Sequence, residues 1–61
     1  MKNYFKEGLT LKFPDRGNVG TGTIVKHRYI ELLDNHSYLI RDRKGDFRIV
    51  KMTTAQLFQF N

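Results

Sequence analysis

The sequence contains no cysteine, so neither a disulfide nor a thiolate metal site can stabilise its 61 residues. Long apolar stretches are also lacking. Runs such as Leu39-Ile40 are far shorter than the ~20 residues that a membrane-spanning helix needs. Residues 1–13 have no apolar core of signal-peptide length. We therefore expect a cytoplasmic protein with no membrane partner.

Groups that support catalysis are equally sparse. Ser37 is the only serine and has no nucleophile elbow around it. The glycines from Gly17 to Gly22 have neither dinucleotide-binding nor P-loop spacing, and a strand is expected to follow them where phosphate binding needs a helix. His27 and His36 flank an expected turn and can approach each other, but two histidines alone define no metal or catalytic site. We expect no enzyme, no catalytic or metal-binding residue and no cofactor.

Positive charge is the most informative part of the composition. Eleven Lys and Arg against six Asp and Glu give a net charge of +5 and a pI near 9.9. Such a balance favours polyanionic partners, although it also serves solubility alone. The length allows a single domain, residues 1–61. A chain this short buries only about 60% of its unfolded surface, so self-association is an open source of extra stability.

Hydrophobic periodicity predicts an all-β chain. Alternation and β-branched runs indicate strands, and no segment has helical periodicity beyond about one turn. The segment Thr53-Thr54-Ala55-Gln56 is expected to supply a hydroxyl N-cap and about one turn of helix before the last strand. Residues 1–7 are expected as a short arm or a helical turn, and a bulge is expected near His27-Arg28. The five predicted strands are Leu9–Phe13, Thr23–Leu33, Ser37–Arg43, Phe47–Met52 and Phe58–Phe60.

The central hairpin sets which side chains share a face. A two-residue turn at Lys44-Gly45 would place Arg41 opposite Arg48, where the two like charges repel each other unless an anion lies between them. A turn longer or shorter by one residue would move each side chain of the return strand to the opposite face of the sheet. With the two-residue turn, the predicted core face holds Tyr38, Ile40, Asp42, Phe47, Ile49 and Lys51.

The order of these elements resembles a small five-stranded SH3-like barrel of the Tudor and KOW kinds. Tyr38-Leu39-Ile40-Arg41, the turn Lys44-Gly45, Ile49-Val50 and Leu57 take the places of a Tudor-like hairpin and helical turn, and Gly20–Ile24 resembles a KOW element. The likeness spans Leu9 to the end of the chain and implies a barrel. The aromatic cage of Tudor domains has no residue-by-residue counterpart here.

These observations predict a small binding module for DNA or RNA, with backbone contacts and low sequence specificity. The alternative is a protein-interaction module: a phage or mobile-element type regulator of a host protein, a binder of an acidic protein, or a homo-oligomer subunit. Tyr29 is expected to be exposed among polar neighbours, whereas the other aromatic residues near the basic positions are expected to be buried. The predicted nucleic-acid-binding residues are Lys26, Arg28, Tyr29, Arg41, Arg43, Lys44 and Arg48.

Overall fold

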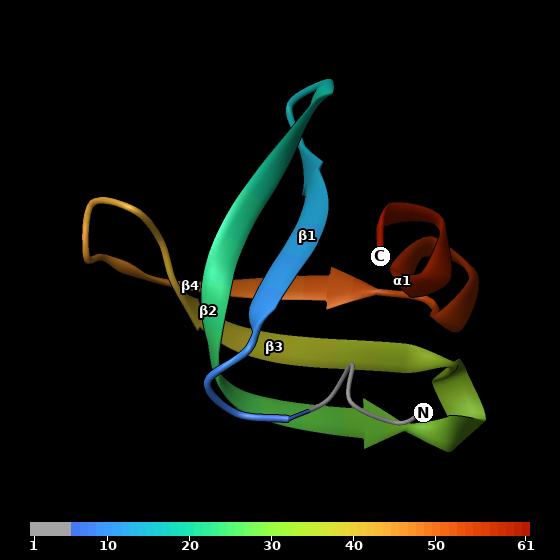
Figure 1. Cartoon of the computed structure of the whole chain (residues 1–61). Helices are drawn as coiled ribbons and strands as arrows, with labels where there is room; N and C mark the ends of the chain where they lie inside the picture. Colours follow the sequence, from blue (N-terminus) through green and yellow to red (C-terminus); the bar gives the residue numbers. More distant parts are fainter. Residues whose placement is uncertain (1–5) are drawn as a thin grey trace.

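The computed structural model describes residues 6–61 and is mostly β (Figure 1). Most of the predicted N-terminal arm, residues 1–5, lies outside the described part. None of the helices in residues 6–61 is both long and apolar enough to cross a bilayer. The elements are β1 (Thr10–Asp15), β2 (Asn18–Ile30), the 3₁₀ helix η2 (Glu31–Leu33), β3 (Asn35–Arg41), β4 (Phe47–Met52) and α1 (Thr54–Phe60).

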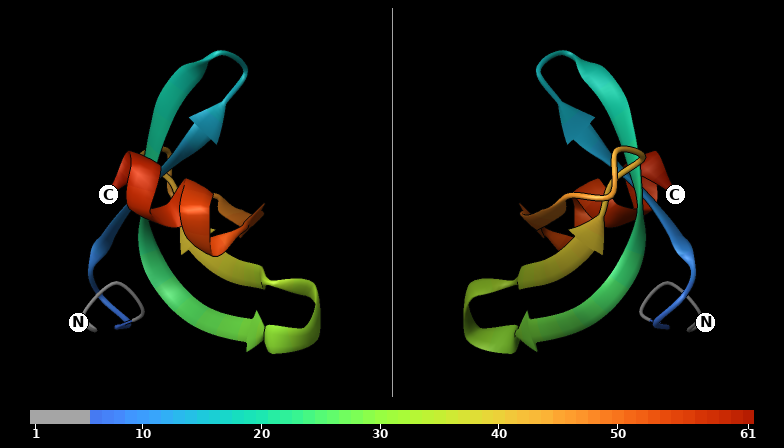
Figure 2. Two further views of the ribbon diagram at one scale, coloured as in Figure 1. Left: turned by 90° about the vertical axis from the view of Figure 1, so that its right-hand side faces the viewer. Right: turned by 90° about the vertical axis from the view of Figure 1, so that its left-hand side faces the viewer.

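The four strands form one antiparallel sheet in the order β1-β2-β3-β4. The long strand β2 belongs to two hairpins, because its first half pairs with β1 and its second half with β3. The β1–β2 hairpin therefore crosses steeply over β3 and β4 (Figures 1 and 2). A register shift between Ile24 and Lys26 accompanies the bend. The predicted bulge exists, but it lies earlier than His27-Arg28.

The turns at both ends of β2 differ from the prediction. Arg16 and Gly17 both have positive φ, as a two-residue type I′ hairpin turn requires, so Pro14 and Asp15 stay in β1. At the other end β2 stops at Ile30 and the chain turns through η2, so the prediction of a strand reaching Leu33 is wrong. Asp34, which ends η2, takes a left-handed conformation with φ 46°.

The β3–β4 connection differs from the predicted two-residue turn. The backbone N–H of Asp42 donates to the carbonyl of Asp46, and the carboxylate of Asp42 accepts from the N–H groups of Lys44 and Asp46, each at 2.9 Å. Gly45 has φ 89°. Three residues thus close the loop, and Arg41 lies opposite Phe47 rather than Arg48. The extra residue reverses the parity of β4 relative to β3.

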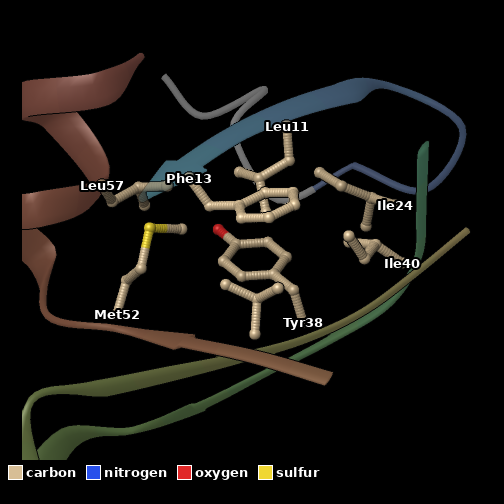
Figure 3. Packing of buried hydrophobic residues seen from close by; sticks show 8 residues of the cluster. Leu11, Phe13, Ile24, Tyr38, Ile40, Met52 and Leu57 are labelled. Carbon is tan, nitrogen blue, oxygen red and sulfur yellow. The ribbon is translucent and has the colours of Figure 1, made fainter. Parts of the chain in front are cut away.

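The core lies on the concave side of the bent sheet and is closed by α1 (Figure 3). Tyr38 and Ile40 are buried as predicted, and Asp42 lines a hollow beside Phe13 and Arg48 on the same side. The prediction that Phe47, Ile49 and Lys51 share this face is wrong. The parity change turns Val50 and Met52 inward instead. The buried apolar residues are Leu11, Phe13, Ile24, Tyr38, Ile40, Val50, Met52 and Leu57.

The C-terminal segment is helical throughout, so the predicted fifth strand, Phe58–Phe60, is wrong. Thr53 is the expected N-cap: its hydroxyl accepts from the N–H of Gln56, whose side chain accepts in turn from the N–H of Thr53. The segment Thr54–Phe60 contains no Gly or Pro that would interrupt a helix. Leu57, on the inner face of this helix, is fully buried.

Asn61 follows α1 and contacts the free edge of β1. Its amide accepts from the backbone N–H of Lys12 at 2.9 Å and donates to the carbonyl of Lys12 at 2.8 Å. One side chain thus makes the pair of hydrogen bonds that a neighbouring strand would make. Among residues 6–61 the sheet has four strands and does not close into the predicted five-stranded barrel.

Candidate nucleic-acid interface

The convex side of the sheet, here called the outer face, follows from the strand register. His36, Tyr38 and Ile40 of β3 are buried, so the alternate residues of β3 point away from the core. Residues directly opposite in neighbouring strands share a face. Thr23, Ile30 and Asn35 belong to this face by the same rule. The eight residues that matter for binding are Lys26, Arg28, Ser37, Leu39, Arg41, Phe47, Ile49 and Lys51.

Four of these eight side chains are cationic and none is acidic: Lys26, Arg28, Arg41 and Lys51. All four are exposed. The one ion pair found among residues 6–61 lies elsewhere, so no carboxylate neutralises the cations of this face. Their positive potential is available to an external anion.

The apolar side chains of the outer face are unusually exposed. Phe47 is 59% exposed and Ile49 is 69% exposed, while Leu39, opposite Ile49 on the neighbouring strand β3, is half-buried. The guanidinium carbon of Arg41 lies 5.2 Å from the centre of the Phe47 ring, within cation–π range. Ile49 and Leu39 also line a shallow hollow of about 460 Å³, together with Lys26, Arg28 and Ser37. The face thus combines cations with apolar contact area.

Among the residues predicted to bind nucleic acid, Lys26, Arg28 and Arg41 come together on the outer face. Arg48 does not join them. It lies on the concave side, 5.3 Å from the centre of the Phe13 ring, and both of its terminal nitrogens are 3.4 Å from carboxylate oxygens of Asp15. The expected repulsion between Arg41 and Arg48 is absent because the two residues are on opposite faces.

The remaining predicted residues lie off the outer face. Arg43 and Lys44 are exposed in the β3–β4 loop. Tyr29 is 44% exposed, as expected from its polar neighbours, but it is on the concave side. Its ring stacks on His36 with 4.3 Å between centroids, and its hydroxyl donates to Asp34 at 3.3 Å. These contacts give Tyr29 a role in packing the β2–β3 corner.

Three residues of the outer face were assigned to the core by the sequence: Phe47, Ile49 and Lys51. All three are in β4, and all three follow from the single error in turn length. The signal that locates them is Asp42-Arg43-Lys44-Gly45-Asp46, in which an Asp accepts from the loop N–H groups and a Gly takes positive φ.

The concave side has a polar chain that ends in the histidines. The hydroxyl of Thr54 has a single hydrogen, and it donates this hydrogen to the carboxylate of Asp34 at 2.5 Å. The same oxygen therefore accepts from Nε2 of His36 at 2.9 Å. Nδ1 of neutral His36 is then an acceptor, and Nε2–H of His27 donates to it at 2.9 Å. The predicted approach of the two histidines is confirmed.

This chain ties the start of α1 to the β2–β3 corner. Burial lowers the pKa of both histidines below 6.5, the neighbouring His36 lowers that of His27 further, and the carboxylate of Asp34 partly opposes the effect on His36. The hydrogen bond from Thr54 is the main cause of the lowered pKa of Asp34. Residues 6–61 contain no group of three or more His, Cys, Asp or Glu side chains arranged for a metal ion.

Comparison with known proteins identifies no relative of this chain. No protein-family model matches the chain, and no match was found among curated proteins or among solved structures. A function for this protein is therefore argued from the geometry of its outer face.

Proposed function

We propose that the protein is a small nucleic-acid-binding module that uses its outer face. The observation that carries the proposal is the set of four exposed cations, with no acidic side chain among them, beside exposed apolar groups. Lysine and arginine neutralise backbone phosphates whatever the base sequence, so the expected binding is weakly sequence-specific and depends strongly on salt.

The Tudor- and KOW-like interpretation is part of the same proposal. A strongly bent β2 shared by two hairpins supports an SH3-like origin of the sheet. In this proposal, α1 and the amide of Asn61 occupy the edge of β1 that a fifth strand covers in a closed barrel.

The test compares two double variants that each remove two positive charges. Arg28→Gln with Arg41→Gln changes the outer face, whereas Arg16→Gln with Arg43→Gln changes the two hairpin turns. Binding of labelled single-stranded DNA, duplex DNA and RNA is followed by fluorescence anisotropy at several salt concentrations. We expect the outer-face double variant to lose affinity and to show a salt slope smaller by about one for each phosphate contact removed.

The control double variant is expected to bind almost as the wild type does, because its charges lie away from the face. Equal losses in the two double variants would mean that only net charge matters. Absence of binding to all three nucleic acids at low salt would overturn the proposal.

A protein-interaction module is the second candidate, and a separate apolar corner favours it. Leu32 is 93% exposed and Leu33 67% exposed, in η2 at the end of the β2–β3 hairpin. Neighbouring apolar side chains of this kind are typical of contact surfaces. Self-association through this corner would make the melting temperature rise with protein concentration, and Leu32→Ser would remove that dependence.

A further inference from the structure

We infer that the outer face binds single-stranded rather than duplex nucleic acid, with unpaired bases packing on Phe47 and Ile49 between the cations. This inference rests on the proposed function and names the form of its ligand. The starting observation is that the parity of β4 places both apolar side chains beside cations, on the side of the sheet away from the core.

Phe47 is held in place and remains accessible. Its cross-strand partner Arg41 has its guanidinium carbon 5.2 Å from the ring centre, and 59% of the residue is still exposed. An aromatic ring beside an arginine offers flat surfaces on which a base can stack.

Cations flank the apolar residues across β3 and along β4. One row across the sheet is Lys26, Leu39 and Ile49; the next is Arg28, Ser37 and Lys51. Arg41 and Phe47 lie on the other side of the first row. Arg41 and Ser37 are four residues apart along β3, which is ~13 Å at the usual rise of a strand. A strand of a few nucleotides crossing this distance meets cations at both ends, with Phe47 beside Arg41 and Ile49 in the middle for base contacts.

A duplex fits the same face poorly. Its bases are stacked inside, and reading them requires a helix or ribbon that enters a groove. The described outer face is built from strand side chains alone. A duplex resting on it would contact the cations but leave Phe47 and Ile49 without base partners, whereas unpaired bases cover them.

Charge also decides against a second copy of the chain as the occupant. Two outer faces in contact would bring eight cations together without a carboxylate from either face, since each contributes four. An acidic peptide meets the cations but has no flat groups for Phe47, and it serves as a competitor in the test.

The experiment measures anisotropy of a labelled, unstructured 12-nucleotide single strand and of the same strand annealed to its complement, as DNA and as RNA, at low and near-physiological salt. Phe47→Ala is compared with Phe58→Ala, which removes another exposed phenylalanine, 52% exposed on α1. Phe47→Leu keeps apolar bulk without the ring and provides a second variant if Phe47→Ala folds poorly, as judged by circular dichroism.

We expect the wild type to bind the single strand at least tenfold more tightly than the duplex. Phe47→Ala should weaken single-strand binding by about five- to 150-fold, the range for loss of one base–aromatic stack, and leave duplex binding unchanged. Phe58→Ala should bind as the wild type does. Comparing the affinities for the DNA strand and the RNA strand shows which of the two nucleic acids the outer face prefers.

Two results would overturn the inference and leave the proposed function in place: duplex binding as tight as single-strand binding, or an equal loss of both in Phe47→Ala. Competition by polyglutamate at equal charge concentration, as effective as competition by unlabelled single strand, would overturn it in favour of an acidic protein partner. Failure of every nucleic acid to bind would reject the proposed function itself.

Discussion

The two faces of the β3–β4 hairpin have the same backbone and opposite chemistry. On the concave face, Tyr38, Ile40 and Val50 are buried, and among the described residues no buried side-chain polar atom lacks a hydrogen-bond partner. On the outer face, Phe47 and Ile49 are largely exposed. Side chains of the concave face therefore determine stability, whereas those of the outer face are available for binding.

The sharpest test of this contrast uses the same substitution on both faces. Ile40 is fully buried and Ile49 is 69% exposed, in neighbouring strands. Ile40→Ala should lower the free energy of unfolding by about 2–5 kcal/mol, because it leaves a cavity in the core. Ile49→Ala should change it by less than about 0.5 kcal/mol. Urea unfolding followed by circular dichroism measures both, and similar losses in the two variants would contradict the assignment of faces.

A smaller effect is expected from the polar chain of the concave side. Thr54→Val keeps the shape of the side chain but removes the donor to Asp34 and the acceptor for His36. We expect a loss of about 1 kcal/mol in the free energy of unfolding, since Nε2–H of His36 loses its acceptor. Asp34 keeps the hydrogen bonds from the Tyr29 hydroxyl and from the backbone N–H of Thr54. The pKa of Asp34 should rise, because the bond from Thr54 is the main cause of its lowered value.

The matched control for this substitution is Thr23→Val, at an exposed threonine of β2. Its effect on unfolding should be within about 0.5 kcal/mol. Urea unfolding and an NMR titration of the Asp34 carboxyl group separate the two variants. An unchanged Asp34 titration in Thr54→Val would show that the hydroxyl does not hold the carboxylate.

The contrast between the faces also shows what the sequence can predict. The strands of the central hairpin and the Thr53 N-cap follow from local chemistry: β-branched runs, a glycine turn and a hydroxyl before a helix-forming segment. The number of residues in the turn is a finer property. It depends on whether the carboxylate of Asp42 accepts from Lys44 and Asp46, and that choice alone reverses the parity of β4.

The end of the chain is a second case in which distant contacts decide. Phe58-Gln59-Phe60 alternates as a strand does, and the alternation predicted one. The helix prevails because Leu57 is buried in the core and Asn61 bonds the backbone of Lys12, 49 residues away in sequence. No periodicity within a short window contains such information. The residues of the candidate outer face were predicted only in part: Lys26, Arg28 and Arg41 lie on it, whereas the error in the length of the β3–β4 turn assigned the β4 residues to the wrong side.

The smallest expected effect is a dependence of stability on pH that originates on the concave face. His27 and His36 have folded-state pKa values below 6.5, mainly because burial disfavours the charged imidazole. The unfolded chain therefore binds more protons between the folded and unfolded pKa values, and stability rises with pH in that range. Full stability is present above about pH 6.5 and declines as the pH falls through the folded values.

The effect is modest because the carboxylate of Asp34 offsets part of the cost of protonating His36. Urea unfolding at pH 8 and pH 5, with NMR titration of both imidazoles, measures it. Asp34 affects stability in a lower pH range. Because its pKa is lowered in the folded state, its contribution to stability is lost only as the pH falls below about 3.8 and the carboxylate is protonated. Unfolding midpoints that are equal at pH 8 and pH 5, or a His36 imidazole that titrates above pH 6.5, would contradict this account, because Nδ1 of His36 accepts from His27 only while the His36 ring is neutral.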